Sequence, residues 1–190
     1  MALPQEKRYT FADVLNWDED VRVELINGIP YMMSPPTRAH QEISGELYGQ
    51  LYTFLRGKPC RVYAAPFGVR LFSEGSDAPE DEETVLEPDL SVICDRDKLD
   101  QYGCKGAPDL IIEILSPSTQ HRDRFEKLEL YRRAGVREYW IVDPEKKFVQ
   151  TMVLEDGRYP VGQVYTAADQ VPVSVLEGCV IDLAPVFEED

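Results

Sequence analysis

The sequence predicts an α/β protein with a mixed β-sheet flanked by helices, and three patterns in the chain indicate it. A β-branched apolar run at 109–115 and a strand-like run at 138–142 enclose a helical stretch at 119–134. This is the order of a βαβ crossover, whose two strands are parallel. Asn27-Gly28 separates two strand-like runs, which is the strongest short-range signal of a β-hairpin. Short apolar runs in the C-terminal third indicate additional antiparallel strands.

The N-terminal part of the chain is predicted to hold a short helix, the hairpin and a longer helix. Thr10, with Asp13 three residues later, is typical of a capping arrangement at a helix start. Ile43, Leu47 and Leu51 recur at helical spacing, so one face of the longer helix should pack inward. The elements expected here are a helix at 11–17, hairpin strands at 21–26 and 29–33, and a helix at 40–56.

The rest of the chain is predicted to be rich in β-strands. Gly135 should end the helix at 119–134, because glycine readily adopts the left-handed conformation that closes helices. Asp156-Gly157 and Glu177-Gly178 mark turns between strands. We expect one domain over residues 1–190, with strands at 61–71, 85–94, 109–115, 138–142, 148–154, 159–165, 171–175 and 179–183.

The charge balance is strongly acidic. With 35 acidic and 20 basic side chains the net charge is −15, which repels polyanions at long range and is the opposite of the usual nucleic-acid footprint. This balance does not exclude a local basic groove. Seven of the fourteen residues at 74–87 are acidic, and we expect this segment to be a solvated, mobile loop.

The cellular compartment is predicted from the apolar runs and the cysteines. No run is long enough to span a bilayer, and residues 1–9 lack the apolar core of a signal peptide, so we expect a cytoplasmic protein without a membrane partner. The four cysteines are scattered, with no C-x-x-C pair and no neighbouring histidine. We therefore expect reduced thiols and neither a zinc site nor a disulfide scaffold.

Glu113 is a carboxylate inside an otherwise apolar strand. Burying it without a partner costs several kcal/mol, so it should meet a metal ion, a cation or hydrogen-bond donors. Asp109 lies four residues earlier on the same strand, roughly 13 Å away at about 3.3 Å per residue, too far to share one ion. Asp89 lies on a separate strand, and laterally neighbouring side chains can approach within about 5 Å. Two carboxylates so close favour a divalent cation, and oxygen ligands suit Mg²⁺ or Mn²⁺.

A lysine on the following helix is the third candidate of the site. Asp123 and Lys127 fall only about 40° apart on a helix face at about 100° per residue. Apolar residues border this pair, so it should face the sheet and Lys127 can extend its ammonium to the end of the Glu113 strand. The alternatives are an ordinary surface pair of Asp123 with Lys127, and a structural salt bridge from Glu113 to an arginine.

Together these residues resemble a known nuclease pattern. Pro88-Asp89 followed by Glu113-x-Leu115 is similar to the PD-(D/E)XK nuclease pattern, and residues 8 to 185 resemble the Uma-type restriction endonuclease-like family. The superfamily has a lysine where this chain has Leu115, and Lys127 looks like its migrated substitute. Matching motifs are 24–28, 33–36, 87–90, 113–119 and 135–144, with His40, Asp123, Lys127 and Tyr131.

The resemblance implies a restriction endonuclease-like fold and a metal-dependent endonuclease that hydrolyses DNA phosphodiester bonds. Asp89 and Glu113 would then hold Mg²⁺ or Mn²⁺, and Lys127 would orient the attacking water. Glu24, His40 and Asp123 are secondary candidates, and Arg122 and Arg124 are candidate contacts to substrate phosphate.

Other functions and the oligomeric state remain as separate expectations. A catalytically inactive nuclease-fold protein that acts in binding or assembly is the main alternative, and the strong acidity favours it. A serine hydrolase is disfavoured because Ser116 and Ser118 lie in no G-x-S-x-G turn. Double-strand cleavage would favour two active sites, so a homodimer is expected.

Overall fold

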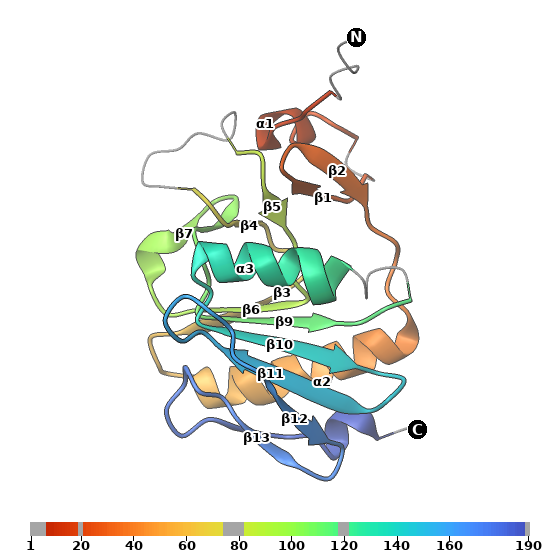
Figure 1. The fold of residues 1–190 in the computed structure, drawn as a ribbon, viewed down its shortest axis with the longest axis vertical. Coiled ribbons are helices and arrows are strands. Elements are labelled where there is room, and N and C mark those ends of the chain that lie inside the picture. The colour runs from red at the N-terminus through yellow and green to blue at the C-terminus, as the bar shows by residue number, and fades with distance from the viewer. Residues whose placement is uncertain (1–6, 19–20, 74–81, 118–121, 189–190) are drawn as a thin grey trace.

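The computed structural model describes residues 7–18, 21–73, 82–117 and 122–188, and this part of the chain forms three β-sheets with helices packed against them (Figure 1). The central sheet has the strand order β12-β11-β10-β9-β6-β3. Its strands are β3 (Arg61–Ala64), β6 (Leu90–Ile93), β9 (Leu110–Ile114), β10 (Glu138–Asp143), β11 (Phe148–Val153) and β12 (Gln163–Thr166).

The central sheet is mixed. Strands β9 and β10 are parallel, which confirms the predicted βαβ crossover, and the other neighbouring strands are antiparallel. A π-helical segment, η3 (Arg122–Lys127), and helix α3 (Leu128–Ala134) connect the two parallel strands. Gly135 ends α3 with a φ of 87°, as predicted. Because β9 and β10 are buried along their whole length, Glu113 on β9 lies deep in the fold.

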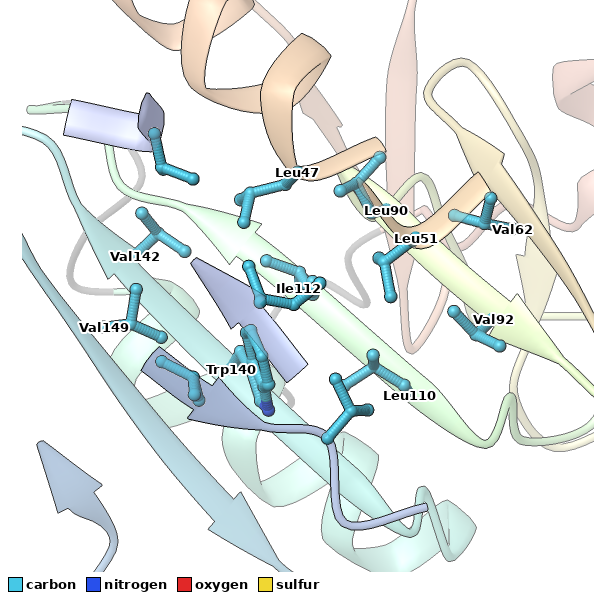
Figure 2. Packing of buried hydrophobic residues seen from close by; sticks show 14 of the residues in the cluster. Leu47, Leu51, Val62, Leu90, Val92, Leu110, Ile112, Trp140, Val142 and Val149 are labelled. Carbon is cyan, nitrogen blue, oxygen red and sulfur yellow. The ribbon is translucent and has the colours of Figure 1, made fainter. Parts of the chain in front are cut away.

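Helices cover both faces of the central sheet. Helix α2 (Arg38–Leu55) packs its predicted apolar stripe against one face, and Figure 2 shows Leu47 and Leu51 beside Ile112 and Leu90 of the sheet. The helix begins two residues earlier than expected, after Thr37, whose side chain accepts a hydrogen bond from a backbone N–H. The C-terminal strands β13 (Gln170–Pro172) and β14 (Val180–Asp182) and the 3₁₀ turn η4 (Pro185–Phe187) join this side.

The opposite face carries α3 and a second sheet, with strand order β2-β1-β5-β4-β8-β7. The predicted hairpin is confirmed: Asn27 and Gly28 have φ values of 49° and 77°, as this tight turn requires. The predicted cap is confirmed too, since the Thr10 N–H donates to Asp13 at 2.8 Å. The elements are α1 (Phe11–Val14), β1 (Val23–Ile26), β2 (Ile29–Met32), β4 (Val69–Arg70), β5 (Val85–Leu86), β7 (Leu99–Asp100) and β8 (Gly103–Lys105), with the 3₁₀ turn η2 (Arg96–Lys98).

Two predicted strands were wrong, because each divides between the two sheets. The strand expected at 61–71 breaks at Ala65-Pro66, and β3 and β4 belong to different sheets. The strand expected at 85–94 breaks around Pro88 into β5 and β6. Proline has no N–H to donate to a strand ladder, so each proline marks the point where the chain leaves one sheet for the other.

The acidic segment and two cysteines also differ from expectation. Residues 74–81 of the predicted loop lie outside the described residues, and residues 85–86, where the loop prediction overlapped the strand prediction at 85–94, form the buried strand β5. Cys60 and Cys94 form a disulfide, whereas reduced thiols were expected. They flank the pair Arg61 and Ile93 on neighbouring strands β3 and β6, and this cross-strand proximity arises only on folding.

Candidate functional site

The ammonium of Lys127 lies at the centre of a cluster of three carboxylates. Its Nζ is 2.8 Å from Oε1 of Glu24, 2.9 Å from Oε1 of Glu113 and 3.4 Å from Oδ1 of Asp123. All four side chains are buried, with Lys127 and Glu113 each only 3% exposed. We call these four residues the lysine–carboxylate cluster. It excludes the alternative of a surface pair between Asp123 and Lys127, and the partner of Glu113 is a lysine rather than an arginine.

Local structure explains why these side chains converge. On β9, the alternate residues Leu110, Ile112 and Ile114 pack on the α2 side, so Glu113 must face α3. The crossover returns over that face, and Asp123 and Lys127, at the two ends of one helical turn, point inward together. That turn is a π-helix, a form that is rare and often found at functional sites. Glu24 arrives from the buried strand β1 of the hairpin.

Asp89 lies beside Glu113 across two antiparallel strands. In the pairing of β6 with β9, Leu90 is opposite Ile112, and the same register continued by one residue places Asp89 opposite Glu113. The Asp89 Oδ2 accepts a hydrogen bond from the Ile114 N–H at 2.7 Å. Directly opposite residues of an antiparallel pair have neighbouring side chains on one face. Asp89 therefore neighbours Glu113, as expected from the sequence, and a shared metal ion stays a prediction.

Of the other candidates from the sequence, His40 contacts Asp89, whereas Asp109 lies elsewhere. His40, in the first turn of α2, has its Nε2 3.2 Å from Asp89 Oδ1. Asp109 is away from the cluster, because its carboxylate accepts from the Cys94 N–H at 2.8 Å and pairs with Arg137 at 3.0 Å. Asp109 thus makes structural contacts at the other end of β9 from the cluster.

The pKa values follow from burial and from the crowding of acidic groups. Burial raises the pKa of Glu113 well above its usual value, the charge of Lys127 opposes this, and the carboxylates of Asp123, Asp89 and Glu24 raise it further. Burial alone would lower the pKa of Lys127, but Glu113, Glu24 and Asp123 outweigh it and raise that pKa well above its usual value. Lys127 is therefore an ammonium at neutral pH, and a single positive charge faces three acidic groups.

The pKa of His40 also reflects competing effects. Burial lowers it, but the hydrogen bond to Asp89, the charge of that carboxylate, a backbone hydrogen bond at Ile114 and the charge of Asp123 together outweigh burial, so the pKa rises above its usual value. His40 can therefore hold a proton against Asp89 in mildly acidic and near-neutral solution.

The donor set fits a hard divalent cation. Asp89, directly before β6, and Glu113, on the neighbouring strand β9, offer carboxylate oxygens, which is the ligand type that Mg²⁺ and Mn²⁺ prefer. The acidic excess around Lys127 would be reduced by a divalent charge. Within the described ranges no three acidic, histidine or cysteine side chains form a complete metal-binding group. Water or substrate oxygens would have to complete the coordination of an ion held by Asp89 and Glu113.

The two arginines proposed from the sequence have different surroundings. The Arg122 guanidinium stacks over the Tyr31 ring of the hairpin, 4.0 Å from its centroid. Arg124 instead forms an ion pair with Asp143 at 3.2 Å. Arg122 is consequently the better candidate for contact with a phosphate, since no carboxylate of the described residues pairs with it.

Sequence reasoning assigned no role to one residue that contacts the site. Tyr131 is fully buried, and its hydroxyl donates to Oε1 of Glu113 at 2.5 Å. Its spacing of four residues from Lys127 was a usable signal, because residues four apart share a helix face.

Comparisons with known proteins decide the family. A family model, Uma2, described as "Putative restriction endonuclease", matches residues 11–184. The chain belongs to the Uma2 family. This confirms the family that the sequence motifs indicated. Among the described residues of this Uma2 member, no helix is sufficiently long and apolar to cross a membrane.

A solved structure supports the fold, and one curated protein is similar in sequence over part of its length. The crystal structure of a putative nuclease belonging to DUF820, from Anabaena variabilis ATCC 29413, matches with a TM-score of 0.73 at 20% identity, covering 94% of this chain and 97% of that chain. The restriction endonuclease-like fold class is thereby confirmed. The uncharacterized protein slr1290 of Synechocystis sp. is 28% identical over 121 residues, which are 63% of this chain and 60% of that protein's length.

Proposed function

We propose that this protein is a metal-dependent endonuclease that hydrolyses DNA phosphodiester bonds. The observation that carries the proposal is the buried ion pair of Lys127 with Glu113, at 2.9 Å, beside Asp89 at the start of the neighbouring strand β6. A buried lysine and carboxylates at a strand end are what phosphoryl hydrolysis needs, namely metal ligands and a fixed positive charge. Membership of a nuclease family supports nucleic acid as the substrate class.

Each residue then has a defined task. Asp89 and Glu113 would hold Mg²⁺ or Mn²⁺, which would lower the pKa of a bound water and offset charge on the scissile phosphate. Lys127 keeps the acidic groups together, and its ammonium would orient the attacking water. His40 holds one oxygen of Asp89 at 3.2 Å, which limits the orientations of that carboxylate.

Substrate contact is assigned to Arg122. Its guanidinium lies over the Tyr31 ring, 4.0 Å from the centroid, and a guanidinium can donate N–H groups to phosphate oxygens while it contacts an aromatic face. A local contact of this kind can act despite the net charge of −15, because salt screens the long-range repulsion beyond about 10 Å at 0.1 M.

We also propose that the protein is a homodimer in the cytoplasm. Size-exclusion chromatography with light scattering measures the oligomeric state directly.

A catalytically inactive binding protein is the second candidate, and one observation favours it. Lys127 already has three carboxylate partners within 3.4 Å, so its ammonium already acts as their counterion and stabilises the fold. In that case the cluster would be a structural ion network in a nuclease fold that binds nucleic acid or a partner without cleaving it.

Plasmid nicking separates these two functions. Wild-type protein is incubated at low salt with supercoiled DNA and either Mg²⁺ or Mn²⁺, alongside Asp89→Asn and Glu113→Gln. We expect wild-type nicking and a loss of more than about 100-fold in both variants, since each removes a metal ligand worth several kcal/mol. Glu129→Gln is the matched control, because Glu129 is an exposed carboxylate on α3 that pairs only with Arg132 among the described residues. Absence of nicking with either metal, with DNA binding retained, would support the inactive binding protein.

A further inference from the structure

Tyr131 contacts the proposed metal ligand Glu113 from the helix side. The residue lies one turn beyond Lys127 on α3, and its side chain is fully buried. Its hydroxyl donates to Oε1 of Glu113 at 2.5 Å. Lys127 donates to the same oxygen at 2.9 Å. Two donors from consecutive turns of one helical segment therefore converge on a single carboxylate oxygen.

A second tyrosine holds Tyr131 in place. The rings of Tyr131 and Tyr139 are in edge-to-face contact, with centroids 5.0 Å apart and planes at 61°. The Tyr139 hydroxyl donates to the backbone carbonyl of Asp123 at 2.9 Å. Tyr139 lies on β10, opposite Ile111 of the Glu113 strand. The tyrosine pair thus joins β10 to η3 and α3, and the Tyr139 ring packs against the Tyr131 ring that carries the donating hydroxyl.

The two donors determine which oxygen of Glu113 a cation would meet. Both hydrogen bonds end on Oε1, so the carboxylate is held by one edge and Oε2 is the oxygen left for a metal ion. A carboxylate fixed in this way loses little rotational freedom when it binds an ion. Hydrogen-bond partners of metal ligands commonly contribute 10–100-fold to metal affinity for this reason.

We propose that Tyr131 is a positioning residue that orients Glu113 for a divalent cation, a role that rests on the proposed metal-dependent function. The Tyr131 hydroxyl is the donor in this contact, and the Glu113 oxygen is the acceptor. Tyr131 itself touches neither the cation nor the substrate in this scheme.

The test removes the hydroxyl alone. Tyr131→Phe keeps the buried ring and its contact with Tyr139, whereas Tyr159→Phe is the matched control. Tyr159 also donates a partly buried hydroxyl hydrogen bond, at 2.7 Å to the Val136 carbonyl, but it does not touch the lysine–carboxylate cluster. Mn²⁺ affinity is measured by electron paramagnetic resonance of the free ion, and folding is measured by urea denaturation and circular dichroism.

We expect Tyr131→Phe to bind Mn²⁺ about 10–100-fold more weakly and Tyr159→Phe to bind it as the wild type does. In the nicking assay the half-saturating Mn²⁺ concentration should rise for Tyr131→Phe, with the rate recovering at high Mn²⁺. A purely structural role would lower the urea midpoint and leave Mn²⁺ affinity unchanged in the folded protein, which would overturn the proposal.

The outcomes also separate this inference from the proposed function. Weaker Mn²⁺ binding in Tyr131→Phe without DNA nicking by the wild type would support the positioning role and contradict the nuclease. Nicking by the wild type with equal Mn²⁺ affinity in both proteins would support the nuclease and overturn the positioning role. Lack of Mn²⁺ binding by the wild type would overturn both.

Discussion

Replacing Lys127 by methionine tests how far the fold depends on a single buried ammonium. Methionine keeps the length of the apolar stem and removes only the charge and the hydrogen-bond donors. The three carboxylates within 3.4 Å would then lose their common counterion while remaining buried. We expect a strongly destabilised but folded protein at low pH and a partly unfolded protein at neutral pH.

The distances allow the size of this effect to be worked out. At an effective dielectric constant of about 20, unit charges 2.8 Å apart attract by about 6 kcal/mol, and those 3.4 Å apart by about 5 kcal/mol. Desolvation of the ammonium and repulsion among the carboxylates oppose these attractions. Removal of one partner from a buried pair therefore costs about 3–5 kcal/mol in net terms. This is a large part of the roughly 5–15 kcal/mol that stabilises an ordinary domain.

The cost should depend on pH in a defined direction. Glu113 already has a raised pKa, and without Lys127 its pKa should rise further. An acid whose folded-state pKa is raised contributes stability below its unfolded-state pKa and loses it as pH rises through the folded-state pKa. The variant should therefore regain stability as the pH falls from about 8 toward 5, whereas it is weakest at high pH.

Urea denaturation at several pH values measures these effects through the free energy of unfolding. The double variant Lys127→Met/Glu113→Gln should recover part of the loss, with a coupling energy of about 1–3 kcal/mol, because it removes one uncompensated carboxylate. Lys98→Met is the control, since that ammonium donates to the Ala107 carbonyl at 2.7 Å and should cost only about 1 kcal/mol. A loss for Lys127→Met no larger than for Lys98→Met would refute the reasoning.

Three further predictions concern stability outside the cluster. Serine at both Cys60 and Cys94 should lower the free energy of unfolding by about 4 kcal/mol in non-reducing buffer, given their sequence separation of 34; an equal stability of wild type and variant would show that the thiols are reduced. The pKa of Asp100 is lowered: burial is the largest single effect and raises it, but the hydrogen bonds from Arg70 and the Tyr102 N–H, together with the charges of Arg70 and Lys105, outweigh burial. The stability that the Asp100–Arg70 pair contributes is present above the unfolded-state pKa of Asp100 and is lost as pH falls through its folded-state pKa. Between pH about 5 and about 3 the wild type should therefore lose more free energy of unfolding than Asp100→Asn. Parallel pH curves of the two proteins would contradict this. Gly28→Ala should cost at least about 1–2 kcal/mol, because φ is +77° there and an added Cβ would lie 2.8 Å from a neighbouring side-chain carbon; an unchanged thermal midpoint would argue against strain at this turn.

Local patterns in the sequence determined several elements of the fold. Asn27-Gly28 specifies a tight turn whatever surrounds it, and the stripe of Ile43, Leu47 and Leu51 specifies the buried face of α2. The order of the apolar runs was enough for the parallel pairing of β9 with β10. Glu113 within such a run required a charged or donating partner on energetic grounds alone. In each case the interactions that determine the element join residues a few positions apart or residues of one βαβ unit.

Only the tertiary structure decided where consecutive strands go and which groups surround Lys127. Pro66 and Pro88 reveal a break in a strand, but not that the chain then enters another sheet, because that choice depends on burial across the whole molecule. The contact of Glu24 with Lys127 spans the hairpin and the crossover, and the hydroxyl of Tyr131 reaches Glu113 only after α3 has packed on the sheet. Such contacts join residues distant in the chain, and although the spacing of Lys127 and Tyr131 places them on one helix face, it does not specify which distant groups that face meets. The sequence by itself thus determined the elements and the need for a partner at Glu113, and packing determined which partners it has.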